Sequence, residues 1–351
     1  MNINNQSDYL YDAAILRLVL VFLLVYYHAF AIYSGAWDSL NGYPEIKTYW
    51  WLDKLSYAFM LEAFVFVSGY VFGYQVRCKG EEKLKADSVI VGKFKRLMIP
   101  CLLFSIIYIA IFFDFTRPVH NIIYNIISGV GHMWFLPMLF WCFVGIWLIE
   151  KLQLGSRWVF PILIFLSIMP HISSPFRIGH AFSFLIYFYT GYYIQRSGCF
   201  PTIKRYNIAI LVTASAFILS FLVFTMLFER LPDIIGEGRS LIADRYVVTV
   251  FRKVGRLLLS STGIIMMMLI IWFINSKRKT PFPQSLIKIS DLCMGVYLFQ
   301  QFVLKYMYYH TNIPDMLNPY LLPWVGFLVA LTISIMLAFG VKRTKIGKKI
   351  I

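Results

Sequence analysis

Long apolar runs are the feature that most constrains what this chain can fold into. About 20 apolar residues in a helix cross the ~30 Å hydrocarbon core of a bilayer. Ten segments are candidates, of which the fifth and sixth are short: 13–34, 57–76, 98–113, 133–150, 158–170, 182–195, 207–228, 256–275, 291–309 and 321–341. The sequence predicts an all-α protein, a polytopic membrane helix bundle of about ten transmembrane helices, as a single domain over residues 1–351.

Composition agrees with a membrane protein. The chain is 59% hydrophobic and only 14% charged, whereas soluble domains are about 45–50% apolar and about 25% charged. The formal net charge is +16, but the basic residues fall between the apolar runs. That placement suits helix orientation by the positive-inside rule better than nucleic-acid binding. We therefore expect membrane lipids around the protein and no nucleic-acid partner.

The basic residues are unequally divided between the two sets of loops. One set, which includes 77–97 and the tail from Lys342, carries 21 Lys and Arg residues, and the other carries 10. This bias predicts that both termini lie in the cytoplasm. The loop 229–256 is an exception with six basic residues, which four acidic residues offset. Its length predicts a small outward-facing lid or an interfacial helix.

The five cysteines are scattered and include no C-x-x-C pair. They are interpreted as small apolar fillers, so we expect no metal site and no disulfide framework. The first apolar run is longer than a signal-peptide core, and neither a basic segment before it nor a small-residue cleavage site after it is present. We interpret it as a retained membrane helix.

Arg17 and His28 are two cationic or potentially cationic residues within the first apolar run. Their separation of 11 positions corresponds to ~1100° of helix rotation, so both side chains share one face at depths ~16.5 Å apart. With the N-terminus inside, Arg17 lies near the cytoplasmic side and His28 lies deeper. The pair is either structural, with Arg17 extending to the interface, or functional.

Glu62 interrupts the second apolar run, and a carboxylate there needs a partner or a proton. We expect Arg17, His28 and Glu62 to meet in a polar cavity between the first two helices; a purely structural hydrogen bond of Glu62 is the alternative. In the same helix, Ser68 and the adjacent Gly69 allow close approach of another backbone or a ligand.

Two further groups of polar residues lie at helix ends. His132 and Trp134 open the fourth run at its outer end, where Trp134 alone would be a common membrane anchor. Lys93, Lys95 and Arg96 precede the third run on the cytoplasmic side. They either set topology or bind the phosphates of a cytosolic ligand.

Taken in order, these residues resemble the acyltransferase-3 family of integral membrane acyltransferases. The resemblance covers about residues 12–340. Its parts are the R-x10-H pair Arg17 and His28, FVFVSGY at 64–70, KFKRLMIP at 93–100, HMWFL at 132–136, YFYTGYYI at 187–194 and SDLCMGVYLFQQ at 290–301. The last motif departs from the family pattern, because Gln300 occupies the position of a usual histidine. Glutamine forms hydrogen bonds but is no base near neutral pH. The exchange is tolerable if this position only orients a ligand, and it puts activity in doubt if the position relays a proton.

The resemblance implies transfer of an acyl group, most often acetyl, from cytosolic acyl-coenzyme A to a hydroxyl. The acceptor that it implies is an envelope sugar of a bacterium, such as an O-antigen, capsule or exopolysaccharide unit or its lipid-linked precursor. The expected location is the inner (plasma) membrane, and acetyl-coenzyme A is the expected co-substrate, with no metal. The sequence does not define the oligomeric state or the acceptor.

Roles follow from the resemblance as hypotheses. Lys93, Lys95 and Arg96 would bind coenzyme A phosphates, with Arg17 deeper at the pantetheine or thioester. His28 would be either the general base or the carrier of the acyl group. Glu62 would orient His28. His132 and Trp134 would bind the acceptor, and Ser68 and Gln300 are further candidates for substrate binding. A secondary transporter and a non-catalytic partner of a polysaccharide assembly complex are the alternatives.

Overall fold

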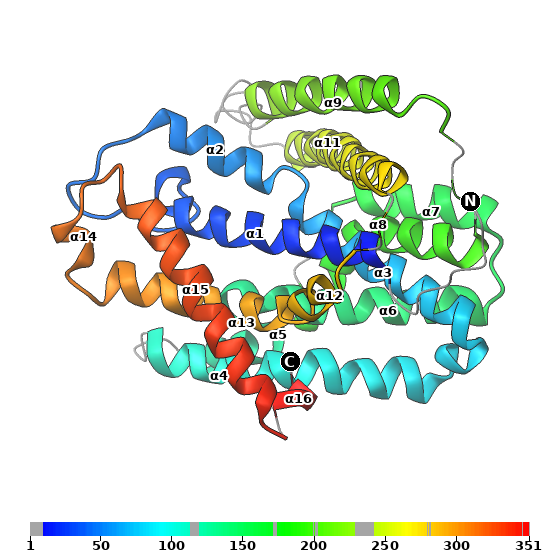
Figure 1. Ribbon diagram of the computed structural model, residues 1–351, viewed down its shortest axis with the longest axis horizontal. Coiled ribbons are helices and arrows are strands. Elements are labelled where there is room, and N and C mark those ends of the chain that lie inside the picture. The colour runs from blue at the N-terminus through cyan, green and yellow to red at the C-terminus, as the bar shows by residue number, and fades with distance from the viewer. Residues whose placement is uncertain are drawn as a thin grey trace.

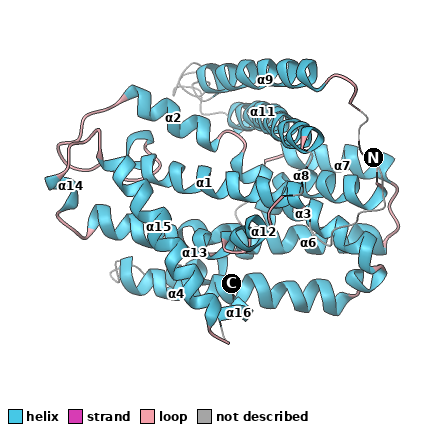
Figure 2. Cartoon of the chain, viewed as in Figure 1, coloured by secondary structure: helices cyan, strands magenta, loops and turns pink. Residues whose placement is uncertain are grey.

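The computed structural model describes residues 10–112, 119–170, 174–198, 200, 203–228, 242–278, 280, 282–345 and 347–350. Within these ranges every regular element is a helix and no strand occurs (Figure 2). The α-helices are α1 (Tyr11–Ser34), α2 (Lys47–Tyr57), α3 (Met60–Lys79), α4 (Ile99–Phe112), α5 (Val119–Ser128), α6 (Phe135–Lys151), α7 (Ser156–Ile168), α8 (Ile178–Ser197), α9 (Tyr206–Val223), α11 (Ile242–Lys277), α12 (Gln284–Ser290), α13 (Cys293–Tyr309), α14 (Ile313–Met316), α15 (Leu322–Arg343) and α16 (Gly347–Ile350).

Short 3₁₀ and π segments connect some of these helices. The 3₁₀ segments are Glu81–Leu84, Gly131–Trp134 and Pro175–Arg177, and the π segments are Asp87–Val91, Phe94–Met98 and Phe224–Phe228. A π segment adds a residue to a helical turn and so redirects the side chains that follow, which is why it is frequent at functional sites. Phe94–Met98 contains two of the basic residues that the sequence singled out, Lys95 and Arg96.

The predicted fold class is confirmed, whereas the count of ten spans is not. Among the described residues, seven helical segments are long and apolar enough to cross a membrane, and the bent pair α12 and α13, at 46°, would make eight. The predicted fifth span is α7, whose 13 residues extend only ~20 Å. The predicted sixth span is α8, which has 20 residues. It is too polar to qualify as a membrane span, and much of it is buried against other helices.

The predicted outer loop 229–256 is partly wrong. Helix α11 begins at Ile242 and continues to Lys277, so the second half of the supposed loop is helical. This helical half was not predicted because its charged side chains end the apolar run at residue 256. Residues 229–241 lie outside the described residues, so the predicted lid does too. Four cysteines, Cys78, Cys101, Cys142 and Cys293, are free; of these only Cys78 is exposed, so it is no core filler.

Helix α1 lies at the centre of the bundle (Figure 1). It packs against α2, α3, α11, α12, α13 and α15. At the periphery, α9 packs mainly on α11 and leaves large apolar side chains uncovered, such as Leu211 with 67% and Val212 with 60% of its surface exposed. Such a surface is stable against hydrocarbon and costly in water. The exposed apolar surface of α9 therefore suits contact with lipid, whereas much of α1 is buried among other helices.

Helices α3 and α8 approach closely because each presents glycine to the other. A Cβ atom added at Gly69 would lie 2.0 Å from the carbonyl oxygen of Phe188, and one added at Gly191 would lie 2.2 Å from that of Phe66. Close backbone approach through small residues is a common means of packing helices in membranes. The close approach expected at Gly69 is thus confirmed, with a backbone as the partner.

Replacing Gly69 by alanine should separate α3 from α8 and destabilise the protein by about 1–3 kcal/mol, a typical cost of overpacking. The thermal midpoint of the detergent-solubilised protein measures this. The matched control is Gly340→Ala on α15, where an added Cβ meets nothing within 4 Å and the substitution should be neutral or stabilising. Equal midpoints for Gly69→Ala and wild type would contradict the close contact.

Candidate active site

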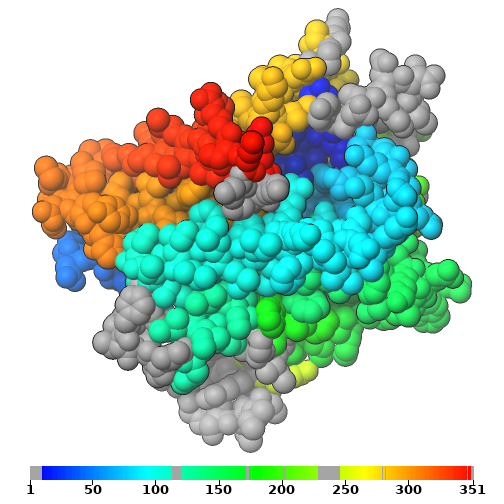
Figure 3. Space-filling model, turned by 90° about the horizontal axis from the view of Figure 1, so that it is seen from below, coloured from blue at the N-terminus to red at the C-terminus, as the bar shows by residue number. Residues whose placement is uncertain are grey.

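A basic cavity of about 510 Å³ lies at one end of α1 and is called here the Arg17 cavity. Its charged lining residues come from four parts of the chain: Arg17 on α1, Lys93 and Arg96 before α4, Asp291 before α13, and Lys342 on α15. Figure 3 shows the beginning of α1, in dark blue, recessed between the yellow and red C-terminal segments and the cyan segment that leads into α4. The described lining thus holds four cations and one acid.

The cations of the Arg17 cavity differ in how they are held. Arg17 forms no hydrogen bond or ion pair with any described residue, so its guanidinium is available to a ligand. Lys93 lies 4.1 Å from the centre of the Phe143 ring, a cation–π contact. Lys342 pairs loosely with Asp291 at 3.8 Å. An anionic ligand would find several partially satisfied cations here.

The basic triplet predicted before the third span is divided by the structure. Lys93 and Arg96 line the Arg17 cavity. Lys95 is exposed and is not part of the lining, because adjacent residues of a helical turn project in different directions. Ser68 is in the lining, and its hydroxyl donates a hydrogen bond of 2.8 Å to the carbonyl of Phe64 one turn earlier. It therefore presents its remaining lone pair, and not its proton, to the cavity.

His28 lies one helical turn beyond Leu24, the last residue of α1 that lines the Arg17 cavity. Its side chain is buried, and its Nδ1 atom has no hydrogen-bond partner among the described residues. The ring of Trp37 stacks on it at 5.6 Å between centroids. The side chain of Gln300 of α13 faces the ring of His28, but neither amide atom of Gln300 forms a hydrogen bond of ordinary geometry with a described residue. Buried polar atoms left unpaired in this way are costly unless a ligand satisfies them.

His132, in contrast, has partners at both ring nitrogens. Its Nδ1 contacts Gln301 Oε1, and its Nε2 lies 3.2 Å from the carbonyl oxygen of Leu298. The same Gln301 oxygen accepts the backbone N–H of His132 at 3.1 Å, which identifies it as an acceptor for the ring N–H too. His132 is therefore held in place, and its ring centre is 6.3 Å from that of His28.

Trp134, the other predicted residue of this segment, lies among aromatic side chains. Its ring is 5.6 Å from that of His180 and 6.1 Å from that of Phe184 between centroids. Phe184 in turn lines a second cavity, described below. Trp134 is half-buried and belongs to the wall between the helices, so the structure does not bring it next to His28 with His132.

The predicted cluster of Arg17, His28 and Glu62 is wrong. Glu62 forms a two-pronged ion pair with Arg256 of α11, at 2.7 Å from Nε to Oε1 and 3.0 Å from the second nitrogen to Oε2. The guanidinium also donates to the Tyr57 carbonyl at 2.9 Å. Both carboxylate oxygens are thereby occupied, so Glu62 does not orient His28. A geometry of this kind compensates the desolvation of two buried charges.

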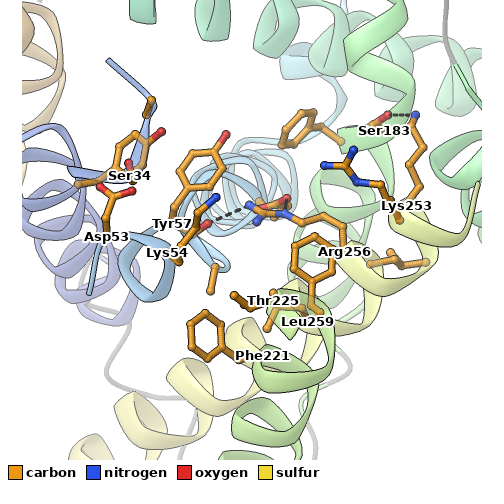
Figure 4. A pocket seen from close by; sticks show the side chains of 18 of the residues that line it. Ser34, Asp53, Lys54, Tyr57, Ser183, Phe221, Thr225, Lys253, Arg256 and Leu259 are labelled. Carbon is orange, nitrogen blue, oxygen red and sulfur yellow. Dashed lines mark hydrogen bonds and ion pairs between the residues drawn. The ribbon is translucent and has the colours of Figure 1, made fainter. Parts of the chain in front are cut away.

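A second cavity, of about 450 Å³, lies on the far side of this ion pair and is called here the Asp53 cavity (Figure 4). It is lined by Tyr27 and Ser34 of α1, Asp53 of α2 and Glu62 of α3, together with residues of α8 and α11. Leu24 lines one cavity and Tyr27 the other. The two cavities therefore both reach α1 within one turn, and His28, which follows Tyr27, lines neither of them.

Sequence reasoning missed three residues of this region. Gln301 follows Gln300 in the late motif and was not separated from it, although it is the residue that holds His132. Arg256 was counted in an outer loop, although it is a helical residue. Lys305 lies within the predicted span 291–309 and was not considered for the site; its Nζ atom is 5.4 Å from the ring centre of Trp37, which stacks on His28. A charge within an apolar run was the signal available for Lys305 and Arg256.

The fold and the site together define a polytopic membrane protein with buried polar groups between two cavities. A family profile described as an acyltransferase domain matches residues 10–343, so the chain belongs to the acyltransferase-3 family. The match covers every residue discussed above. No curated protein and no solved structure matches the chain. Membership in the family supports a membrane acyltransferase in general, but it identifies neither the acyl donor nor the acceptor.

Breaking the buried ion pair should be more harmful than removing it. Glu62→Ala or Arg256→Ala alone leaves one unpaired buried charge and should cost about 3–5 kcal/mol. The double variant should be no less stable than the worse single variant, because neither charge is then orphaned. Thermal midpoints of the four proteins in one detergent test this. Strictly additive losses would show that the two side chains do not interact.

Proposed function

We propose that this membrane acyltransferase moves an acetyl group from cytosolic acetyl-coenzyme A to a hydroxyl of an envelope sugar, or of its lipid-linked precursor. The observation that carries the proposal is the unpaired His28 Nδ1 and Gln300 amide, buried one turn from the end of a basic cavity. The cavity suits a polyanionic donor, and the unpaired atoms suit the reacting groups. In this proposal the protein is a multi-pass protein of the bacterial inner membrane with its Arg17 end on the cytoplasmic side.

The donor would enter the Arg17 cavity with its phosphates at Lys93 and Arg96. Arg17 and Leu24 are seven residues apart, a rise of ~10.5 Å, and both line the cavity. An extended pantetheine arm can follow that wall of α1 from the cations towards His28. Arg17, with no protein partner in the described structure, would then hold a phosphate or the amides of the arm by its five donors.

The reaction would occur at His28. The acceptor oxygen attacks the thioester carbonyl carbon while His28 takes the hydroxyl proton. The carbon–sulfur bond then breaks, and the proton passes to the departing sulfur to give the free thiol of coenzyme A. An acyl-imidazole on His28 is the other route consistent with a buried, unpaired ring nitrogen. Gln300 would donate an amide N–H to the carbonyl oxygen, where charge develops.

His132 has a positioning role in this scheme. Its Nδ1–H donates to Gln301 Oε1 and its Nε2 faces the carbonyl oxygen of Leu298, and the ring lines neither cavity, so neither nitrogen is directed at a reacting hydroxyl. Lys305 provides a positive charge near the rings of Trp37 and Tyr108 and so favours an anionic transition state in their vicinity. A glutamine at position 300 is compatible with this scheme, since no proton relay is required there.

His28→Ala should abolish acetyl transfer while the protein still reaches the membrane. The assay follows the label from labelled acetyl-coenzyme A into an acceptor in isolated membranes, with the amount of protein determined in the same membranes. His28→Gln, which keeps a hydrogen-bonding side chain but no base, should be equally inactive. Wild-type product from either variant would eliminate the catalytic role. Absence of labelled product from wild-type membranes supplied with the native envelope acceptor would instead favour a transporter.

Lys93→Ala should weaken binding of the acyl donor. The KM for the donor should rise by about tenfold, the effect of losing about 1.4 kcal/mol of binding free energy, and kcat should change less. Lys95→Ala is the matched control, because Lys95 is exposed and outside the cavity lining. Arg17→Lys keeps the charge but loses the planar fork of donors, so it should also impair donor use. Equal effects of Lys93→Ala and Lys95→Ala would contradict the donor site.

A further inference from the structure

The Asp53 cavity carries a pattern of charge that the acyl donor does not require. Its described lining includes four basic residues, Lys54, Arg252, Lys253 and Arg256, and two acidic ones, Asp53 and Glu62. Arg256 and Glu62 neutralise each other in the buried ion pair. The remaining basic residues outnumber the one remaining acid. The cavity opens to the surface where its lining residues Gly35 and Ala36 are exposed.

Asp53 is the first sign that the cavity takes a ligand. Only 1% of its surface is exposed, and its Oδ1 atom has no hydrogen-bond partner among the described residues. Figure 4 shows Asp53 near Ser34 at one end of the cavity. A buried carboxylate oxygen without a partner is unfavourable by itself. A ligand hydroxyl that donates a hydrogen bond to it would remove the penalty.

Helix α11 supplies the opposite end of the cavity. Arg252, Lys253 and Arg256 line it within little more than one turn. The Lys253 ammonium is held in place by the carbonyl of Met169 at 2.7 Å and the hydroxyl of Ser183 at 2.9 Å, the latter drawn in Figure 4. Arg252 is exposed and forms no ion pair with a described acidic residue. Two adjacent cations, one fixed and one at the surface, suit a carboxylate or phosphate.

Aromatic hydroxyls occupy the wall between these ends. Tyr27, Tyr57 and Tyr187 all line the cavity, and the rings of Tyr27 and Tyr57 stack with 4.6 Å between centroids. Such rings combine an apolar face with a polar edge, which is the surface that a sugar ring needs. Tyr27 is also next to His28, with 5.0 Å between ring centres. A sugar bound here would lie one residue of α1 from the proposed catalytic base.

We propose that the Asp53 cavity binds the acceptor and that this acceptor is an acidic sugar. Its carboxylate or phosphate lies at Arg252 and Lys253, and its hydroxyls lie towards Asp53. The inference rests on the proposed function, since it names the class of acceptor for that reaction. It separates donor and acceptor into two cavities that both reach α1 within about one turn of His28. Asp53 is a binding residue in this arrangement, and His28 remains the base.

Binding to the full-length protein in lipid nanodiscs tests the inference without requiring catalysis. Three probes are compared: p-nitrophenyl β-D-glucuronide, the matched neutral p-nitrophenyl β-D-glucoside, and glucose 1-phosphate. The wild type should bind the glucuronide or the phosphate about tenfold more tightly than the glucoside, because the charged group gains a charge-assisted hydrogen bond. The preferred anionic probe distinguishes a carboxylate from a phosphate. Equal affinity for all three probes would overturn the proposal.

Variants locate the binding. Arg252→Gln and Lys253→Met should each remove most of the preference for the anionic probe. Asp53→Asn should lower the affinity for the glucuronide and for the glucoside alike. Lys95→Gln removes one positive charge outside both cavities and should change nothing. Arg252 is exposed, so Arg252→Gln should fold even if Lys253→Met does not. Unchanged glucuronide and glucose 1-phosphate binding by Arg252→Gln, with wild-type thermal stability, would overturn the assignment.

The two proposals fail in different ways. His28→Ala should still bind the anionic probe while transferring no acetyl group. If wild-type protein binds the probe through Arg252 but transfers no label from acetyl-coenzyme A to acidic or neutral sugars, the proposed function fails and the assignment of an acceptor fails with it. If label passes to neutral sugars as readily as to acidic ones, the acceptor class alone is wrong.

Discussion

The bundle can hold a buried polar group only where another group satisfies it. This constraint divides the charged and polar residues of the apolar segments into two kinds. Glu62 with Arg256 and His132 with Gln301 have protein partners and fix the positions of α3, α11, α6 and α13. His28, Gln300 and Asp53 each have buried atoms without partners. The satisfied groups are part of the architecture, whereas the unpaired atoms of His28, Gln300 and Asp53 are the ones that lie in or beside the two cavities.

The close contact of α3 and α8 provides the frame for this division. Glycines at positions 69 and 191 let two backbones touch, so α3 is held rigidly beside α1. Ser68 and Glu62 on that helix then face different cavities. A rigid wall between two cavities suits a reaction in which donor and acceptor arrive separately, because each can be bound in place before the groups react. The outer faces of α9 and α15 carry many exposed apolar side chains, which suits contact with lipid.

Much of the fold and part of the site were predictable from sequence. The apolar runs predicted a bundle of membrane helices, because the thickness of a bilayer sets the length of apolar helix that can cross it. The R-x10-H spacing predicted that Arg17 and His28 share one face of a single helix, since the rotation per residue of an α-helix is nearly constant. The pairing of Glu62 was not predictable. Its partner Arg256 is 194 residues away in the chain, and hydrophobicity placed that residue only at the boundary between a predicted loop and the predicted span 256–275.

The sequence by itself determined that this chain is a helical membrane protein of the acyltransferase-3 family, with a cation and a histidine on one helix. These are local properties, fixed by hydrophobicity and by helical periodicity. Only the tertiary structure decided which charges are paired and which are open to a ligand, because that depends on distances between helices far apart in the chain. In it Glu62 pairs with Arg256, His132 is held by Gln301, and the Nδ1 atom of His28 has no partner among the described residues.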